Sequence, residues 1–138
     1  MNNDLHNNLK LTSVISPISQ SGNTAMVGAI IDRQGYGSLE FAITLGTITT
    51  AGTTYTALLE DADELAFNVT NAAVADADLF GTEALASFVD SEINTTKKLG
   101  YKGNKRYVRL TMTPAGNTGA STMSAVAVLG SPDQSPVA

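Results

Sequence analysis

Alternating apolar and polar residues predict β-strands along most of this chain. The clearest case is the run LEFAITL, in which Leu39, Phe41, Ile43 and Leu45 share one face while polar and small residues share the other. A period of two residues is typical of a strand that buries one face and exposes the other. We therefore expect residues 39–45 to form a strand whose apolar face contributes to a hydrophobic core.

Five other segments also predict strands. Residues 53–60 and 105–113 alternate in the same way, whereas residues 24–31 and 122–129 are apolar on both faces. Continuous apolar runs are expected of strands that are covered on two sides. Residues 65–69 predict a further, short strand.

The connections between these segments indicate the fold class. The turn Lys102-Gly103-Asn104 joins residues 95–101 to residues 105–113, which predicts a β-hairpin. A helical turn is expected only around residues 82–87, within an Ala- and Asp-rich stretch. About eight strands with almost no helix predict an all-β fold, an antiparallel β-sandwich or barrel of jelly-roll-like form.

The chain length of 138 residues suits a single domain. We expect this β domain to span residues 10–130. The polar, Asn-rich residues 1–9 predict a flexible N-terminal arm, and residues 131–138, with two prolines, predict an extended tail. The N-terminus has no apolar run and no segment reaches the length of a membrane span, so neither a signal peptide nor a membrane anchor is expected.

Charge is scarce and unevenly distributed. Charged residues make up 15% of the chain, the net charge is −5, and Thr, Ser, Asn, Gly and Ala replace the usual charged surface. Such a surface suits a protein that is packed against neighbours. Six of the eight basic residues nevertheless lie within thirteen consecutive positions: Lys97, Lys98, Lys102, Lys105, Arg106 and Arg109.

Three interpretations of this basic segment stay open: a protein contact, a solvated hairpin and a nucleic-acid site. Net negative charge disfavours binding to a phosphate backbone, and Arg106 and Arg109 fall on opposite faces of the predicted strand. A protein contact explains more, because residues 60–92 carry nine acids and no base. Opposite charges on different sides of a subunit would attract copies head to tail. If the acidic and basic segments lie on the same side of the subunit, their charges would pair within the subunit or face a larger partner.

The sequence offers little reactive chemistry. The chain has no Cys, and its one histidine, His6, lies in the predicted arm, so no catalytic, cofactor or metal site is expected. Carboxylates could bind Ca²⁺ in a carbohydrate-binding β-sandwich, but their spacing lacks a specific calcium loop, and a solvated acidic edge is the simpler interpretation. The residues concerned are Asp61, Asp63, Asp76 and Asp78.

Three blocks of sequence resemble a group of small proteins encoded among the head genes of tailed phages and prophages. They are the run SGNTAMVGAIIDRQGYGSLEF near the start, the run GTEALASF in the middle, and the runs KKLGYKGNKRYVRLTMTPAGNTGAS and SAVAVLGSP near the end. The resemblance covers roughly residues 21–132.

This resemblance implies a virion structural protein without enzymatic activity. The expected role is a capsid decoration or cement protein, made in the bacterial host cytoplasm and bound, as a homotrimer, to the outside of the major capsid protein shell. Nucleic acid and membrane are not expected partners. A head–tail connector, a tail or fibre-like component and a carbohydrate-binding module are the alternatives. The six basic residues are our candidates for partner binding, on charge alone.

Overall fold

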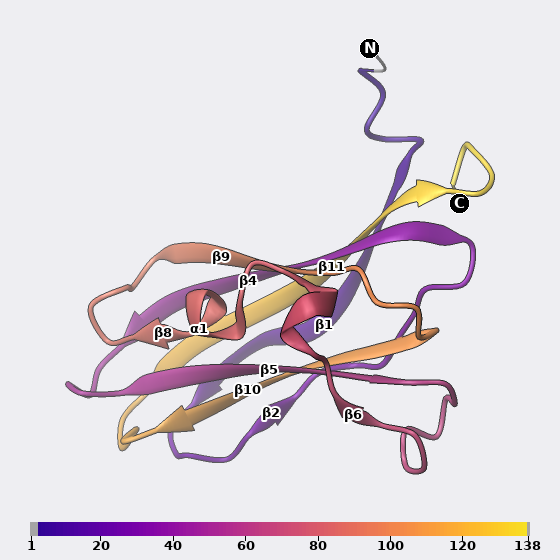
Figure 1. Ribbon diagram of the computed structural model, residues 1–138. Coiled ribbons are helices and arrows are strands. Elements are labelled where there is room, and N and C mark those ends of the chain that lie inside the picture. The colour runs from indigo at the N-terminus through magenta and orange to yellow at the C-terminus, as the bar shows by residue number, and fades with distance from the viewer. Residues whose placement is uncertain (1–2, 138) are drawn as a thin grey trace.

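The computed structural model describes residues 3–137. Two antiparallel β-sheets pack face to face (Figure 1). The prediction of an antiparallel β-sandwich is therefore confirmed. The five-stranded sheet is the upper layer of Figure 1. Its strands, in spatial order, are β1 (Leu9–Gln20), β11 (Ser121–Pro132), β4 (Tyr36–Ile48), β9 (Thr95–Tyr101) and β7 (Leu79–Phe80).

The second sheet, which we call the six-stranded sheet, is the lower layer. Its two long strands, β5 (Thr54–Ala62) and β10 (Tyr107–Ala115), pair along their whole lengths. Short strands flank them on both sides: β2 (Met26–Val27) and β3 (Ile31–Asp32) beside β10, and β6 (Ala72–Ala73) and β8 (Phe88–Val89) beside β5.

The core fills the space between the two sheets. Every second residue of β4 points inward, as the sequence predicts, and Phe41, Ile43 and Leu45 are fully buried. Leu110 and Met112 of β10 face them and are also fully buried. Burial of each such side chain contributes about 1.5–3 kcal/mol, so these alternating positions are a main source of the stability of the fold.

The predicted hairpin at residues 95–113 is wrong. Strand β9 pairs with β4 and β7 in one sheet, and β10 pairs with β5 in the other, so residues 102–106 cross between the sheets. Tyr101 anchors this crossing, because its hydroxyl donates to Asp61 at 2.6 Å and accepts the Lys105 N–H at 3.1 Å. Alternation of side chains shows which face of a strand is buried but does not show which strand lies beside it.

Two other predicted strands differ in the structure. The segment 24–31 is divided into β2 and β3 at Gly28, where an added Cβ would lie 2.5 Å from the Leu110 carbonyl oxygen. The predicted strand at 65–69 is wrong, because this segment is a loop. Phe67 has a φ of 54°, in the left-handed region, and its side chain is buried against Tyr107.

The segment 72–89 closes one open side of the sandwich. It passes from β6 through a 3₁₀ turn, η1 (Asp76–Asp78), to β7, and then through α1 (Glu83–Ala86) to β8. The predicted helical turn at 82–87 is confirmed, and the Thr82 hydroxyl caps it by accepting the Leu85 N–H at 3.1 Å.

Side chains of α1 and its C-terminal cap complete the edge of β5. Glu83 Oε1 accepts the Leu59 N–H at 2.6 Å, and Ser87 Oγ accepts the Ala57 N–H at 3.0 Å. These two N–H groups lie between the short strands β6 and β8 and have no strand partner there. Glu83, one of the nine acids in residues 60–92, therefore completes a strand edge.

The two ends of the chain lie together at one end of the sandwich (Figure 1). The Val137 N–H and the Ser135 hydroxyl both donate to the Asn7 carbonyl oxygen, at 3.0 and 2.9 Å. Strand β11 continues to Pro132, past the expected domain boundary at residue 130. Residues 1, 2 and 138 of the predicted arm and tail lie outside the described residues, and the flexibility of both stays a prediction.

Candidate functional site

The basic segment, residues 97–109, is divided between the two sheets. Lys97 and Lys98 lie on β9, Lys102 and Lys105 lie on the crossing, and Arg109 lies on β10, with Arg106 just before that strand. The segment therefore presents no continuous positive stripe.

Four of the six predicted partner-binding residues pair with acids of the same subunit. Arg106 makes two hydrogen bonds to the Asp32 carboxylate, at 2.9 and 2.8 Å. The four ion pairs are Lys97–Glu92, Lys105–Asp63, Arg106–Asp32 and Arg109–Glu60. The acidic and basic segments thus lie close together and pair within the subunit, one of the arrangements that the sequence leaves open.

In two of these pairs the basic partner lowers the pKa of the acid. The hydrogen bond from Arg106 is the main cause that lowers the pKa of Asp32, and the hydrogen bond from Lys97 is the main cause that lowers the pKa of Glu92. The more exposed of these pairs, such as Arg106–Asp32, contribute little stability individually. Their consequence is that most of the positive charge of the basic segment is already neutralised.

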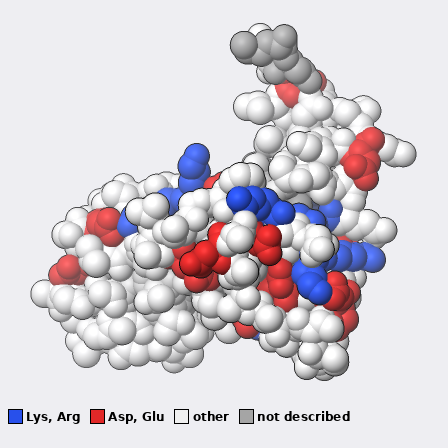
Figure 2. Space-filling view, in the orientation of Figure 1, with Lys and Arg blue, Asp and Glu red and all other residues white. Residues whose placement is uncertain are grey.

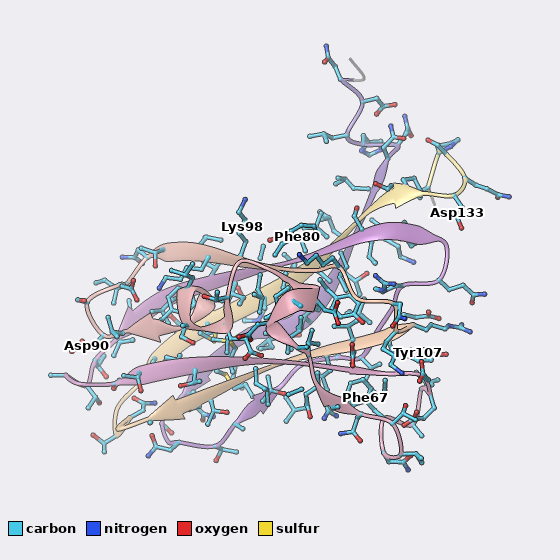
Figure 3. The ribbon with its side chains drawn as sticks, in the orientation of Figure 1. Phe67, Phe80, Asp90, Lys98, Tyr107 and Asp133 are labelled. Carbon is cyan, nitrogen blue, oxygen red and sulfur yellow. The ribbon has the colours of Figure 1, made fainter. Side chains whose placement is uncertain are left out.

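The other two residues, Lys98 and Lys102, form no ion pair with any residue in the range 3–137. Both lie beside Phe80, which is 59% exposed. The Lys102 ammonium lies 5.0 Å from the centre of the Phe80 ring, within the range of a cation–π contact. Figure 3 shows Lys98 and Phe80 on the same side of the molecule, with Lys98 projecting away from β9.

Lys98 and Phe80 belong to the outward surface of the five-stranded sheet, which we call the outer face. Residues directly opposite each other on paired strands point to the same face of a sheet. The register therefore defines two neighbouring rows across the outer face. They are Leu11, Val128, Glu40, Gly100 and Phe80 in one row, and Ser13, Val126, Ala42 and Lys98 in the other.

These two rows are unusually apolar for a solvent-facing surface. Leu11 is 64% exposed and Val126 is 39% exposed, and only Glu40 and Lys98 carry charge. An antiparallel sheet with one solvated face normally alternates apolar inward residues with polar outward ones. The outer face is therefore a candidate interaction surface.

Glu40 is the one acid in these two rows. Its carboxylate is half-buried, and this burial raises the pKa of Glu40, while the nearby Lys98 acts in the opposite direction. Within the described part of the chain it has neither a hydrogen bond nor an ion pair. An unpaired, half-buried carboxylate can accept a donor from a binding partner.

Two hollows flank Phe80 on the outer face. One has a volume of about 430 Å³ and is lined by Glu40, Phe80, Leu85 and Lys98 among others. The other, of about 530 Å³, shares Glu40 and Phe80 and also has Lys102 in its wall. Phe80 thus forms a ridge between two depressions, with Lys98 in the wall of one and Lys102 in the wall of the other.

The end of the sandwich away from the termini carries almost no charge. Figure 2 shows it as the white lower-left part of the molecule, while the charged residues gather in the middle and on the right. The loops at 20–25, 49–53 and 116–120 meet there, through hydrogen bonds such as those from the Asn117 amide to Gln20 and Gly22. The low charge of this end can be recognised in the sequence, because residues 11–31, 41–59 and 110–132 contain no charged side chain.

The predicted calcium candidates do not come together. Asp61 accepts the Tyr101 hydroxyl, Asp63 pairs with Lys105, and Asp76 and Asp78 both lie on η1. In the range 3–137, no three His, Cys, Asp or Glu residues form a group that could hold a metal ion. In the same range, no helix has the length and hydrophobicity needed to cross a lipid bilayer.

Comparison with known proteins shows the fold. No protein-family model and no curated protein sequence matches the chain. The exported protein XepA of PBSX is similar in structure, with a TM-score of 0.57 and 16% identity over 91% of this chain. This chain spans 38% of XepA, so the two proteins share a β-sandwich over well under half of XepA.

Two other solved structures have lower TM-scores. The structure of infectious bursal disease virus, Gx strain, gives a TM-score of 0.46 at 14% identity, covering 93% of this chain and 35% of the viral chain. The CBM22-1–GH10 modules of xylanase 10B from Clostridium thermocellum, complexed with xylohexaose, give a TM-score of 0.42 at 13% identity, covering 94% and 26%.

Proposed function

We propose that this chain is a capsid decoration, or cement, protein of a tailed phage or prophage. In this proposal it binds the outside of the major capsid protein shell as a homotrimer, is made in the bacterial host cytoplasm and becomes part of the virion surface. It has no enzymatic activity, and neither nucleic acid nor a membrane is its partner.

The observation that carries the proposal is the composition of the outer face. Its two rows present the exposed side chains of Leu11, Val126 and Phe80 and the half-buried Val128, with only two charges. Apolar surface of this kind marks a protein interaction site. The sequence resemblance to proteins encoded among phage head genes agrees with a virion role, and XepA of PBSX shares the β-sandwich fold.

A cement protein acts through its number of copies. Each contact between a subunit and the shell contributes only a few kcal/mol, but attachment at several sites of one shell raises the effective concentration of every further contact. A small, rigid β-sandwich with an adhesive face is suited to this role, because little conformational entropy is lost when it docks.

The test compares particles with and without the protein. Particles that lack it should release their DNA at a lower temperature, and adding the purified chain should restore the original release temperature. A dye that reports free DNA during a temperature ramp measures the effect. Particles that are equally heat-stable without the protein would contradict the proposal. A failure of such particles to join tails would instead indicate a connector.

A further inference from the structure

The surface around Phe80 differs from the rest of the basic segment in having free charge. We call it the Phe80 patch: Glu40, Phe80, Leu85, Lys98 and Lys102. Four neighbouring basic residues are neutralised within the subunit, whereas Lys98 and Lys102 are not. Four basic side chains form no ion pair within residues 3–137: Lys98 and Lys102 lie in this patch, Arg33 lines the same hollow as Lys102, and Lys10 lies outside the patch.

The patch also exposes apolar surface beside these charges. Phe80 is 59% exposed and Leu85 is 69% exposed, and both line the hollow of about 430 Å³ that also contains Lys98. On the other side of the Phe80 ring, Lys102 lines the hollow of about 530 Å³. A ligand that fits must therefore combine negative charge with an apolar side chain.

The absence of a side chain at Gly100 shapes the patch. An added Cβ there would lie 2.5 Å from Glu40 Oε2 and 2.8 Å from the Cβ of Phe80. Gly100 thus lets the Glu40 carboxylate and the Phe80 ring stand next to each other on the sheet. Glu40, which has no donor in the described chain, faces the same partner as Phe80.

We propose that the Phe80 patch binds an acidic protein segment that carries an apolar side chain. Carboxylates of the segment pair with Lys98 and Lys102, its apolar side chain packs against Phe80 and Leu85, and a backbone N–H of the segment donates to Glu40. The identification of this segment as part of the capsid shell rests on the proposed function. The patch itself requires only that the partner have this chemistry.

Nucleic acid fits the patch less well than an acidic protein segment. A single-stranded nucleic acid needs several stacking aromatics along a positively charged groove. The patch offers one largely exposed ring, and Glu40 stands between the two lysines in a position that repels a phosphate backbone. An acidic protein segment avoids this conflict, because its carboxylates and N–H groups can be spaced to match both signs of charge.

The binding experiment uses the purified full chain and three labelled probes. The probes are a random copolymer of glutamate and tyrosine, polyglutamate, and a thymidine oligonucleotide, each followed by fluorescence anisotropy. We expect saturable binding that is tightest for the glutamate–tyrosine copolymer. The double variant Lys98→Glu/Lys102→Glu should weaken this binding by about tenfold or more, because two attractive contacts become repulsive. Phe80→Ser should weaken binding of the copolymer more than binding of polyglutamate.

Lys10→Glu is the matched control. It makes the same charge change at an exposed lysine of β1 outside the patch, and it should leave copolymer binding unchanged. Equal weakening by Lys10→Glu would show that binding depends on net charge and would overturn the proposal. Unchanged binding by the double variant, absence of saturable copolymer binding, or tighter binding of the oligonucleotide would also overturn it.

A particle experiment separates this proposal from the proposed function. Purified wild-type chain and the double variant are added to particles that lack the protein, and the attached protein is measured after sedimentation. Attachment of both at equal occupancy would reject the patch as the surface that binds the capsid shell and leave the decoration role standing. Failure of the wild-type chain to attach would reject the decoration role, and copolymer binding would then test the patch alone.

Discussion

Arg109 on β10 and Glu60 on β5 lie directly opposite each other, and Arg109 Nη2 donates to Glu60 Oε2 at 2.9 Å. The same guanidinium lies 4.4 Å from the centre of the Phe67 ring. The Arg109 side chain therefore forms an ion pair and also contacts the loop at 63–71. Both side chains are largely buried, with 22% and 17% exposure. Among the ion pairs of the described residues, this one is the most shielded from solvent.

Replacing Arg109 by Ala should therefore destabilise the protein by about 1–3 kcal/mol, because Glu60 is left without its partner in a poorly solvated place. Chemical denaturation of the wild type, Arg109→Ala, Glu60→Gln and the double variant gives the coupling free energy, which should be about 1 kcal/mol. The more exposed pair Arg106–Asp32 is the control, and its disruption should change stability less. A coupling energy near zero for Arg109 and Glu60 would contradict this interpretation.

Glu83 should be needed for the edge of β5. Replacing Glu83 by Ala removes the acceptor of the Leu59 N–H and should reduce the free energy of unfolding by about 1–3 kcal/mol. Glu83→Gln keeps an acceptor oxygen and should retain most of the stability. Hydrogen exchange provides the local measurement: the Leu59 amide should exchange faster in Glu83→Ala than in Glu83→Gln, and equal rates would exclude this role.

Acid should loosen the loop at residues 64–70. The hydroxyl of Thr70 and the N–H groups of Thr70, Val69 and Asn68 hold the pKa of Glu64 at about 2, against its ordinary value of 4.5. Because the pKa of Glu64 is lower in the folded state, its ionised form stabilises the loop above about pH 4.5, and this contribution is lost as the pH falls towards 2.

An NMR titration measures this effect directly. The Glu64 carboxyl resonance should change near pH 2, together with the amide signals of Val69 and Thr70. In Glu64→Gln these amide signals should lose that pH dependence. A Glu64 carboxyl that titrates near 4.5 in the folded protein would show that the loop hydrogen bonds do not persist in solution.

Ala127 and Val126 are neighbours on β11 that face opposite sides of the sheet. Ala127 is fully buried, so Ala127→Asp places an unpaired charge in the core and should unfold the subunit, with a loss of more than about 4 kcal/mol. Val126 is 39% exposed on the outer face, so Val126→Asp should leave the fold intact and weaken attachment to particles. Circular dichroism and sedimentation with particles separate the two effects. A folded Ala127→Asp protein would contradict the assigned faces of β11.

The faces of the long strands could be predicted from the sequence, whereas their partners could not. The alternation in residues 39–45 predicts the inward side chains of β4 because burial of one face is a local property of the strand. The short turn after Tyr101 resembles that of a hairpin, yet Tyr101 is tied to Asp61, which is forty residues earlier in the chain. Such a distant partner leaves no pattern in the local sequence.

The same limit applies to the candidate site. The sequence shows the concentration of positive charge between Lys97 and Arg109 and leaves pairing within the subunit open, but it does not show which acids pair, because Asp32, Glu60 and Asp63 are far from this segment in sequence. The loop at 65–69 predicts a strand by its apolar residues, whereas in the structure Glu64 accepts the N–H groups of Asn68, Val69 and Thr70 and folds the segment back on itself. The apolar outer face depends on the register of four strand pairs, which only the structure supplies.

The most direct measurement for a decoration role is the number of copies of this chain in purified particles. Quantitative mass spectrometry gives that number relative to the major capsid protein. A decoration role predicts several hundred copies per particle, in a fixed ratio to the shell subunits, because the protein binds repeated sites on the whole shell. A single ring of about six to twelve copies, or a particle without the protein, would contradict it.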